Sequence, residues 1–528
     1  MKNSNERKRV ELFLNDEWLV RKGFTPLDIS KGINWNYQHS NNAATYQTYI
    51  HSLGILNDLL KISKADNNLK LEKKAKDLIL DWNSTDHKKG KNYAWKEHPV
   101  SSRINNIIAF QSNAAKHKLS QKVFDKLVID HCFYLSNERN YKFNNHGLMM
   151  DNALINAASH LADPEKKKLY IEKALYRIRY AIQRDFSRNG VHLENSPEYH
   201  RMILMIYRSI EKKLKELRIP LGKQEIEILK LAHNFRGYII QPNNVYPMIG
   251  DTGNIPDSRI KKIFRDFHDS EAGITIFNNL NEEEPENSSM MIFKSGYFNK
   301  THKHYDDLST YLYLEGEELL IDSGKYSYVI SDPVRQHVVS PKGHNVINLP
   351  GQDYKLVNPF QEQFNLKITK RVSKTNYKLV TGINKLYKGT TLTRYNILTK
   401  ENVCIILDRV VSRDSKEAYQ NFNINENAEI KKITDLEYEI TLNDKLYNIQ
   451  TYNRAGSNIK SEIENGYISR KFGDYQENER ILFKQEGKNL TYITVIHNVK
   501  DDIEVDYVNL KLSKLTYSIN GKEVSIDL

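Results

Sequence analysis

The chain has 528 residues and a mass of 61.8 kDa, which is too long for one ordinary compact domain and fits two large ones. Hydrophobic residues make up 39% and charged residues 27%, so the composition allows a sizeable core and excludes a mainly disordered chain. The net charge of +12 suits a polyanionic partner, which can be nucleic acid, an acidic polysaccharide or an anionic membrane surface. The 32 tyrosines suit sugar contacts, but Tyr is also common in β-sheets.

The cysteines and the apolar segments exclude further classes of protein. Cys132 and Cys404 are the only cysteines, so neither a disulfide framework nor a Cys-based zinc site can be built. The N-terminus has no apolar core of signal-peptide length, and no segment resembles a membrane span. The sequence as given predicts a soluble, cytoplasmic protein, with export by a route not readable from the sequence as the alternative.

The first half of the chain has helical periodicity. Apolar residues recur at helical spacing from Tyr46 to Leu60 and again over residues 171–182 and 203–217. Asp163 stands where it can cap a helix that begins at Pro164. Helices with short polar breaks between them predict a domain of stacked helical hairpins over residues 1–280.

The pattern changes near residue 280. Residues 278–289 are acidic and polar, which favours a linker. After them, apolar and polar residues alternate over residues 308–314, and residues 403–407 and 490–496 are further apolar runs. These patterns predict an antiparallel β domain over residues 281–528.

A cluster of His and Asp residues precedes the first clear strands. His302 and His304 are two residues apart and would project from the same side of a strand. His304, Asp322 and His344 together offer two imidazoles and a carboxylate, a ligand set that suits a divalent metal and most naturally zinc. On spacing alone, ordinary hydrogen-bonded loop histidines are the favoured alternative.

A second motif, Asn144-Asn145-His146-Gly147, stands before a helical pattern. Amide and imidazole donors at a helix N-terminus can bind an anion together with the free backbone N–H groups. The alternative is a plain helix cap made by an Asn side chain, and the residues alone do not choose between them.

A third motif runs from Glu194 to His200. Ser196 is a candidate N-cap and Pro197 a first helical residue, which places Tyr199 in the first turn. A Tyr hydroxyl is a natural proton donor, and cationic neighbours can lower its pKa so that it acts as a base. On these residues alone, a capped helix with a packed Tyr is the favoured alternative.

Three single residues complete the candidates. Asp251 follows the last long helical segment and can orient a catalytic group or cap a turn. Arg103 and Arg335 can each bind a carboxylate through two parallel hydrogen bonds.

Taken in order, these motifs resemble the heparinase II/III-like polysaccharide lyases, including the related alginate lyases. The resemblance covers roughly residues 30–350, and the His-x-His-x-Asp motif that begins at His302, with its following Leu-Ser, is the most specific element. It implies an α/α toroid, complete or incomplete, followed by antiparallel β-sheets of the sandwich type. It also implies cleavage of a uronic-acid polysaccharide by β-elimination.

The resemblance further assigns roles to residues. It implies that Asn145 and His146 hold the uronate carboxylate and that Tyr199 and His302 are the catalytic Tyr and His. We assign substrate contacts, with Arg103 and Arg335, to two residues that stand in or beside the matching motifs: Glu194 and Tyr326.

By the same resemblance, His304, Asp322 and His344 are the metal ligands, and the metal would be structural. The interval from Asp322 to His344 is short for the family, and no secretion signal precedes the motifs, although many relatives act outside the cytoplasm.

The chemistry requires the residue types that the motifs contain. The C5 proton of a uronate is weakly acidic, so elimination needs donors that neutralise the carboxylate, a base at C5 and an acid at the O4 leaving group. Tyr199 can serve as both base and acid when the C5 proton and O4 lie on one side of the sugar. For the opposite epimer, His302 can take the proton while Tyr199 protonates O4.

Two other functions remain open from the sequence. A non-catalytic glycan-binding or capsule-assembly protein of the same fold would also suit the basic charge, although binding alone needs no proton donor and base. A nucleic-acid-binding role is weaker, because the sequence contains no motif of that kind.

Overall fold

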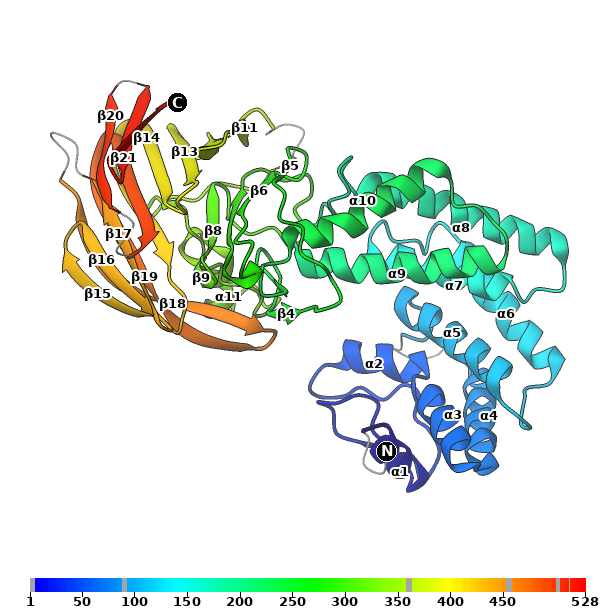
Figure 1. The fold of residues 1–528 in the computed structure, drawn as a ribbon. Helices are drawn as coiled ribbons and strands as arrows, with labels where there is room; N and C mark the ends of the chain where they lie inside the picture. Colours follow the sequence, from blue (N-terminus) through cyan, green and yellow to red (C-terminus); the bar gives the residue numbers. More distant parts are fainter. Residues whose placement is uncertain (1–4, 88–92, 358–362, 453–457, 500–503, 512) are drawn as a thin grey trace. The chain divides into compact units, whose positions relative to one another are not determined.

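The computed structural model describes residues 5–87, 93–357, 363–452, 458–499, 504–511 and 513–528. Helices occupy the N-terminal part of the chain and antiparallel sheets the C-terminal part, which confirms the predicted fold class (Figure 1). The chain divides into two compact units, residues 1–184 with 205–226 and residues 185–204 with 227–528. Helices α9 (Pro197–Glu216) and α10 (Lys223–Ile239) contribute residues to both units.

Unit 1 is built from packed helices. Helix α5 contacts α2, α3, α6 and α7, and α3 also packs on α4. The helices are α1 (Asn5–Leu14), α2 (Ala43–Ser52), α3 (Ile55–Asp66), α4 (Leu69–Ser84), α5 (Glu97–Asn113), α6 (Gln121–Ser136), α7 (Asn145–Ala158) and α8 (Pro164–Asp185), and a short hairpin of β1 (Glu17–Trp18) and β2 (Leu27–Asp28) follows α1.

Helix ends in unit 1 follow the capping residues of the sequence. The Asp163 carboxylate accepts hydrogen bonds from the backbone N–H groups of Glu165 and Lys166, so it caps α8 as predicted. The apolar stripe that begins at Tyr46 forms two helices instead of one. Leu53 adopts a left-handed backbone with φ of 54° and ends α2 before α3 begins.

Arg103 lies in the core of unit 1 and does not fit its predicted role in substrate binding. Its side chain is fully buried, and its guanidinium carbon lies 3.9 Å from the Trp82 ring centroid. Its Nε donates to His131 Nε2 at 3.0 Å, and Nη1 donates to the backbone oxygens of His51 and Ala94. Aromatic and carbonyl groups therefore stabilise this guanidinium inside the protein.

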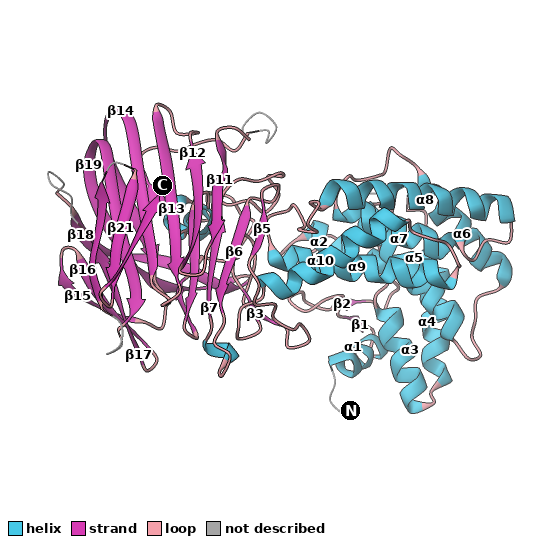
Figure 2. Cartoon of the chain, turned by 45° about the horizontal axis from the view of Figure 1, so that its top comes forward, coloured by secondary structure: helices cyan, strands magenta, loops and turns pink. Residues whose placement is uncertain are grey.

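Unit 2 contains two large antiparallel sheets, a three-stranded sheet and the short pair of β3 (Val245–Tyr246) and β4 (Ile255–Pro256) (Figure 2). The first has the order β5 (Phe267–Asp269), β6 (Ile274–Asn279), β7 (Ser289–Lys294), β8 (Ser309–Leu314) and β9 (Glu317–Leu320). The segment predicted as a linker joins the neighbouring strands β6 and β7 through the 3-10 helix η1 (Pro285–Asn287). The change from helices to strands thus precedes the predicted boundary at residue 280.

The ten-stranded sheet forms the body of unit 2. Its main path runs β11 (Leu366–Ser373), β12 (Tyr377–Asn384), β13 (Thr390–Thr399), β14 (Cys404–Asn423), β19 (Asp474–Asn498), β17 (Lys445–Thr451), β16 (Glu437–Leu442) and β15 (Glu429–Thr434). Strand β10 (Ile347–Asn348) pairs with β14, and β18 (Lys460–Lys471) pairs with β19. The apolar runs near residues 403–407 and 490–496 lie in β14 and β19, as predicted.

Apolar layers separate these elements. On β8, Leu312 and Leu314 pack in the core shared with the ten-stranded sheet, whereas Tyr311 and Tyr313 pack in the core shared with α10. The other face of the ten-stranded sheet packs on the small sheet of β20 (Val505–Lys511), β21 (Lys514–Ile519) and β22 (Lys522–Asp527). The predicted alternation over residues 308–314 is therefore confirmed.

Two further sequence expectations can be compared with the structure. Cys132 and Cys404 are both buried and free. Among the described residues, no helix has the length and apolar character that a membrane span requires.

A buried ion pair connects the ten-stranded sheet to the loops beside β8. The Arg394 guanidinium is fully buried, and its Nε and Nη2 each donate to the Asp408 carboxylate at 2.7 Å. Its Nη1 donates to the backbone oxygens of Leu308 and Asn345. One guanidinium thus holds the start of β8 and the residue after His344 against β13.

We predict that Asp408→Ala lowers the free energy of unfolding of unit 2 by about 3–5 kcal/mol, because the buried Arg394 charge loses the carboxylate that pairs with it. A lower urea midpoint of the unfolding transition would report this loss. Glu439→Ala is the control, since its ion pair with Lys431 is exposed and is expected to be worth less than about 1 kcal/mol. Equal midpoints for the two variants would contradict the prediction.

Candidate active site

Tyr199 is fixed at the start of α9 by a network of hydrogen bonds. The Ser196 hydroxyl accepts from the Tyr199 N–H at 3.3 Å and donates to the Asp251 backbone oxygen at 3.0 Å, which confirms Ser196 as the helix cap. His200 Nδ1 accepts from the His192 N–H, and its Nε2 donates to the Ala232 backbone oxygen. Burial lowers the pKa of His200 to about 3, so this imidazole stays neutral and structural.

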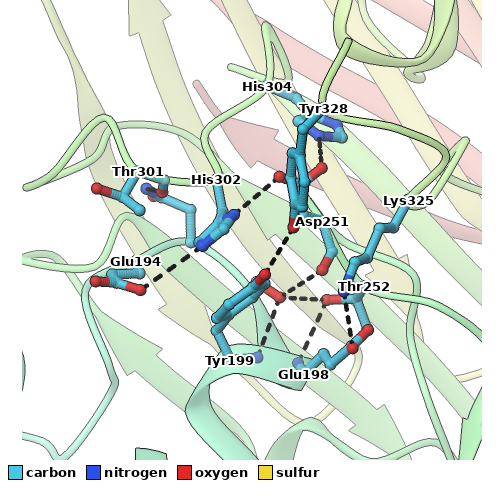
Figure 3. Close-up of polar contacts among 12 residues, drawn as sticks. Glu194, Glu198, Tyr199, Asp251, Thr252, Thr301, His302, His304, Lys325 and Tyr328 are labelled. Carbon is cyan, nitrogen blue, oxygen red and sulfur yellow. Dashed lines mark hydrogen bonds and ion pairs between the residues drawn. The ribbon is translucent and has the colours of Figure 1, made fainter. Parts of the chain in front are cut away.

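The His302 ring lies flat against the Tyr199 ring. The two ring centroids are 3.6 Å apart and the ring planes differ by 19° (Figure 3). His302 has a left-handed backbone with φ of 56°, a conformation that non-glycine residues rarely adopt. The Asn195 side-chain amide donates to the backbone oxygens of Asn299 and Thr301, which stabilises the turn that precedes His302.

The Asp251 carboxylate joins His302 to other residues of the site. It accepts from His302 Nδ1 at 2.9 Å and from His304 Nε2 at 3.0 Å (Figure 3). It also accepts from Arg335 Nη1 at 2.5 Å. Burial favours the neutral form of Asp251, but these three donors outweigh it and hold its pKa well below the ordinary value. Asp251 therefore stays charged and accepts the Nδ1–H of His302, so Nε2 is the ring nitrogen that points away from this carboxylate.

Gly250 is required for this arrangement. It has a left-handed φ of 56°, and a Cβ atom there would lie 2.4 Å from the Asn195 backbone oxygen and 3.0 Å from that of His302. A side chain at this position would push Asp251 away from both loops.

The sequence analysis did not identify Tyr328 or Lys325, which both contact Tyr199. The hydroxyls of Tyr199 and Tyr328 are 2.6 Å apart, and Lys325 Nζ lies 5.1 Å from the Tyr199 ring centroid (Figure 3). Lys325 Nζ also forms an ion pair with Glu198 at 2.9 Å. Both residues closely follow the Asp322-Ser-Gly motif in the sequence, and this position is the signal that could have marked them as candidate site residues.

His304, Asp322 and His344 form a buried cluster with one ligand atom each within 4.8 Å of the others. Among the described residues, His304 Nδ1, Asp322 Oδ1 and His344 Nε2 are buried and have no hydrogen-bond partner. The other ring nitrogens are engaged, since His304 Nε2 donates to Asp251 and His344 Nδ1 donates to Asp322 Oδ2 at 3.0 Å. Three unsatisfied ligand atoms that converge in the interior fit a divalent metal.

The two acidic residues that follow His304 in the sequence bind a lysine side chain instead. Asp306 and Asp307 both form ion pairs with the buried Lys303 ammonium. The expected arrangement of His302 and His304 on one side of a strand is wrong, because both lie in the loop that precedes β8. They nevertheless reach the same carboxylate, that of Asp251.

Three residues of unit 2 were predicted to contact substrate, namely Glu194, Arg335 and Tyr326. Glu194 Oε2 is 3.8 Å from His302 Nε2. Arg335, on α11 (Pro333–Val339), does bind a carboxylate, but it is the carboxylate of Asp251. Tyr326 is partly exposed, and its backbone oxygen accepts from the Gly473 N–H at 2.8 Å.

Asn145 and His146 belong to unit 1, where they begin α7. The helix cap is Asn144, whose side-chain oxygen accepts from the His146 N–H at 2.9 Å. His146 has a side-chain exposure of 41%, and its Nδ1 lies 3.2 Å from Glu97 Oε1. Asn145 and His146 are therefore free of the capping role, and their association with Tyr199 and His302 stays a prediction.

Solved structures with the same fold include a heparinase III and a heparan sulfate lyase from Pedobacter heparinus. The heparinase III has a TM-score of 0.81 and 16% identity, over 99% of this chain and 90% of that one. The heparan sulfate lyase has a TM-score of 0.79 and 16% identity, over 100% of this chain and 89% of that one. At this identity the likeness concerns the fold alone. The search of curated proteins gave no match.

Family models cover nearly the whole chain. The model described as heparinase II/III N-terminus matches residues 2–271, and the model described as heparinase II/III-like, C-terminal, matches residues 263–506. These matches extend well beyond residue 350, where the sequence resemblance ended. The protein therefore belongs to the heparinase II/III-like family.

Proposed function

We propose that this protein is a polysaccharide lyase that cleaves a uronic-acid-containing glycan by β-elimination. The observation that carries the proposal is the stacked pair of Tyr199 and His302, whose centroids are 3.6 Å apart. Two groups that can transfer protons lie side by side, and Asp251 determines the tautomer of one of them. A binding protein has no need of such a pair.

The reaction divides between these two side chains. A base removes the C5 proton, the electron pair forms the C4–C5 double bond, and the C4–O4 bond breaks while an acid protonates O4. His302 Nε2 is suited to the base, because its Nδ1–H donates to Asp251. Tyr199 is suited to the acid, and it can serve as both groups for a sugar whose C5 proton and O4 share one side.

Asn145 and His146 complete the proposal by binding the uronate carboxylate. Donors of hydrogen bonds to this group stabilise the negative charge that develops when C5 loses its proton. The exposure of His146 and its place in the first turn of α7 support this assignment, since N–H groups at a helix N-terminus also favour an anion.

A structural zinc ion is the metal that we assign to His304, Asp322 and His344. Two imidazoles and one carboxylate suit zinc, and the three unsatisfied ligand atoms support a metal at this point. A bound divalent ion would neutralise the buried Asp322 charge and brace the cluster. The N–H on the other ring nitrogen of His304 then donates to Asp251. Because Asp251 also accepts from His302, the metal would help to position His302 through these two hydrogen bonds.

Heparan sulfate and related glycosaminoglycans are the substrates to test first. Two solved structures with this fold are named as heparinase III and heparan sulfate lyase. The net charge of +12 suits any acidic glycan and does not distinguish among them.

Incubation with heparan sulfate, other glycosaminoglycans, alginate and capsular glycans tests the function. Elimination conjugates the new double bond with the carboxylate and raises ultraviolet absorbance, whereas hydrolysis does not. We expect at least one polymer to give this product with metal present. Binding without any such product would favour a glycan-binding protein and overturn the proposal.

Tyr199→Phe should lower kcat by about 100- to 10,000-fold while binding of the substrate changes little, because it removes a proton-transfer group and keeps the ring. Initial rates by ultraviolet absorbance and calorimetric binding separate these two effects. Tyr176→Phe is the control, since Tyr176 is 73% exposed on α8 in unit 1. Wild-type turnover in Tyr199→Phe would refute the assigned role.

His344→Ala should abolish metal binding, because it removes one of the three buried ligands. Elemental analysis is expected to find about one zinc per wild-type chain and almost none in the variant. His268→Ala is the control, since His268 Nδ1 pairs with the Thr275 hydroxyl and lies outside the cluster. Equal metal contents in the two variants would exclude this site.

A further inference from the structure

Four aromatic side chains form an exposed surface next to the Tyr199–His302 pair. We call Tyr326, Tyr328, Phe472 and Tyr475 the aromatic rim. Tyr328, Phe472 and Tyr475 are 47%, 53% and 48% exposed. Large aromatic rings left in water gain little free energy on folding, so such a group usually marks a binding surface.

The rim brings together two segments that are far apart in the sequence. Tyr326 and Tyr328 lie in the loop after Asp322, whereas Phe472 lies in the turn between β18 and β19 and Tyr475 lies at the start of β19. The rings of Tyr328 and Phe472 are 5.5 Å apart, and those of Tyr326 and Tyr475 are 5.4 Å apart. The last third of the chain thus contributes to a surface beside the catalytic pair.

Backbone contacts hold the two segments together. The Gly473 N–H donates to the Tyr326 backbone oxygen at 2.8 Å, and the Lys325 N–H donates to that of Ser469 at 3.2 Å. The buried Ser469 hydroxyl also donates to the Lys325 backbone oxygen at 2.6 Å. The rim is therefore preorganised, which reduces the entropy that ligand binding must overcome.

The rim is continuous with the catalytic pair. The Tyr328 hydroxyl lies 2.6 Å from that of Tyr199, and the Tyr328 ring centroid lies 6.0 Å from that of His302. From Tyr328 the aromatic surface continues to Phe472. A ligand bound at the catalytic pair that extends past Tyr328 therefore meets Phe472.

Two cations lie beside the rings of the rim. Lys325 Nζ is 5.6 Å from the Phe472 ring centroid, and the Arg335 guanidinium carbon is 5.6 Å from that of Tyr328. An aromatic surface packs against the C–H face of a pyranose ring. Both cations also pair with carboxylates, Lys325 with Glu198 and Arg335 with Asp251, so the exposed aromatic faces carry most of the recognition. A sugar ring fits these faces.

We propose that the aromatic rim is a subsite that binds a sugar of the acidic glycan chain adjacent to the bond that is cleaved. This inference rests on the proposed lyase function and extends it, because it assigns recognition of the glycan to the β18–β19 turn. Phe472 is the residue on which it depends most, since it lies at the tip of that turn and contacts both Tyr328 and Lys325.

The test compares Phe472→Leu, which keeps an apolar side chain, with Phe472→Trp, which keeps an aromatic ring. On a glycan that the wild type cleaves, Phe472→Leu should raise KM about tenfold, whereas Phe472→Trp should stay close to wild type. Phe133→Leu is the matched control, because Phe133 is 68% exposed on α6 in unit 1. Thermal unfolding midpoints verify that each variant is folded.

Calorimetry with a heparan sulfate hexasaccharide, or with an oligosaccharide of the polymer that is cleaved, measures the same effect on binding in a Tyr199→Phe background. Weaker binding with Phe472→Leu, but not with Phe133→Leu, supports the subsite. Cleavage by the wild type with unchanged KM and affinity in Phe472→Leu overturns the subsite and leaves the lyase function standing. Absence of both cleavage and binding by the wild type overturns the lyase function and the subsite together.

Discussion

The buried carboxylate of Asp251 is the contact on which the candidate active site depends. It accepts hydrogen bonds from His302 and His304, in the loop before β8, and from Arg335 on α11. Through these bonds it orients His302, the proposed base, and His304, one of the three residues proposed to hold a metal. Its position requires Gly250, whose left-handed backbone lets two loops approach closely. A single charge therefore joins the stacked pair of Tyr199 and His302 to the buried group of His304, Asp322 and His344.

The order of short motifs was sufficient to predict the family, the helical-then-β fold and the buried His-Asp-His cluster. The alternation over residues 308–314 also predicted a strand, and the structure shows its alternate side chains in two different cores. Composition did not reveal that residues 278–289 connect paired strands, since polar turns and linkers look alike in sequence. Arg103 was misassigned because burial among aromatic rings depends on packing over long separations.

Contacts made by residues far apart in the sequence explain what else the sequence could not predict. The hydroxyls of Tyr328 and Tyr199 are in contact although the two residues are 129 positions apart in the sequence. Phe472 contacts Tyr328 because the pairing of β18 with β19 brings their turn next to the loop of Tyr328. From the sequence, Asp251 could either orient a catalytic group or cap a turn, and only the fold shows that it accepts hydrogen bonds from His302 and His304. Motif spacing identifies the residue types that a reaction needs. The hydrogen-bond partners that orient these residues can be identified only from the tertiary structure.

The kcat of Asp251→Asn, with zinc measured in the same preparation, tests the central claim most directly. The amide is uncharged and close in shape, so it removes the charge that fixes His302 while it disturbs packing least. The account predicts that kcat falls about 100-fold or more in protein whose metal content and unfolding midpoint equal those of the wild type. Turnover within about twofold of wild type would contradict the claim that this carboxylate prepares His302 for catalysis.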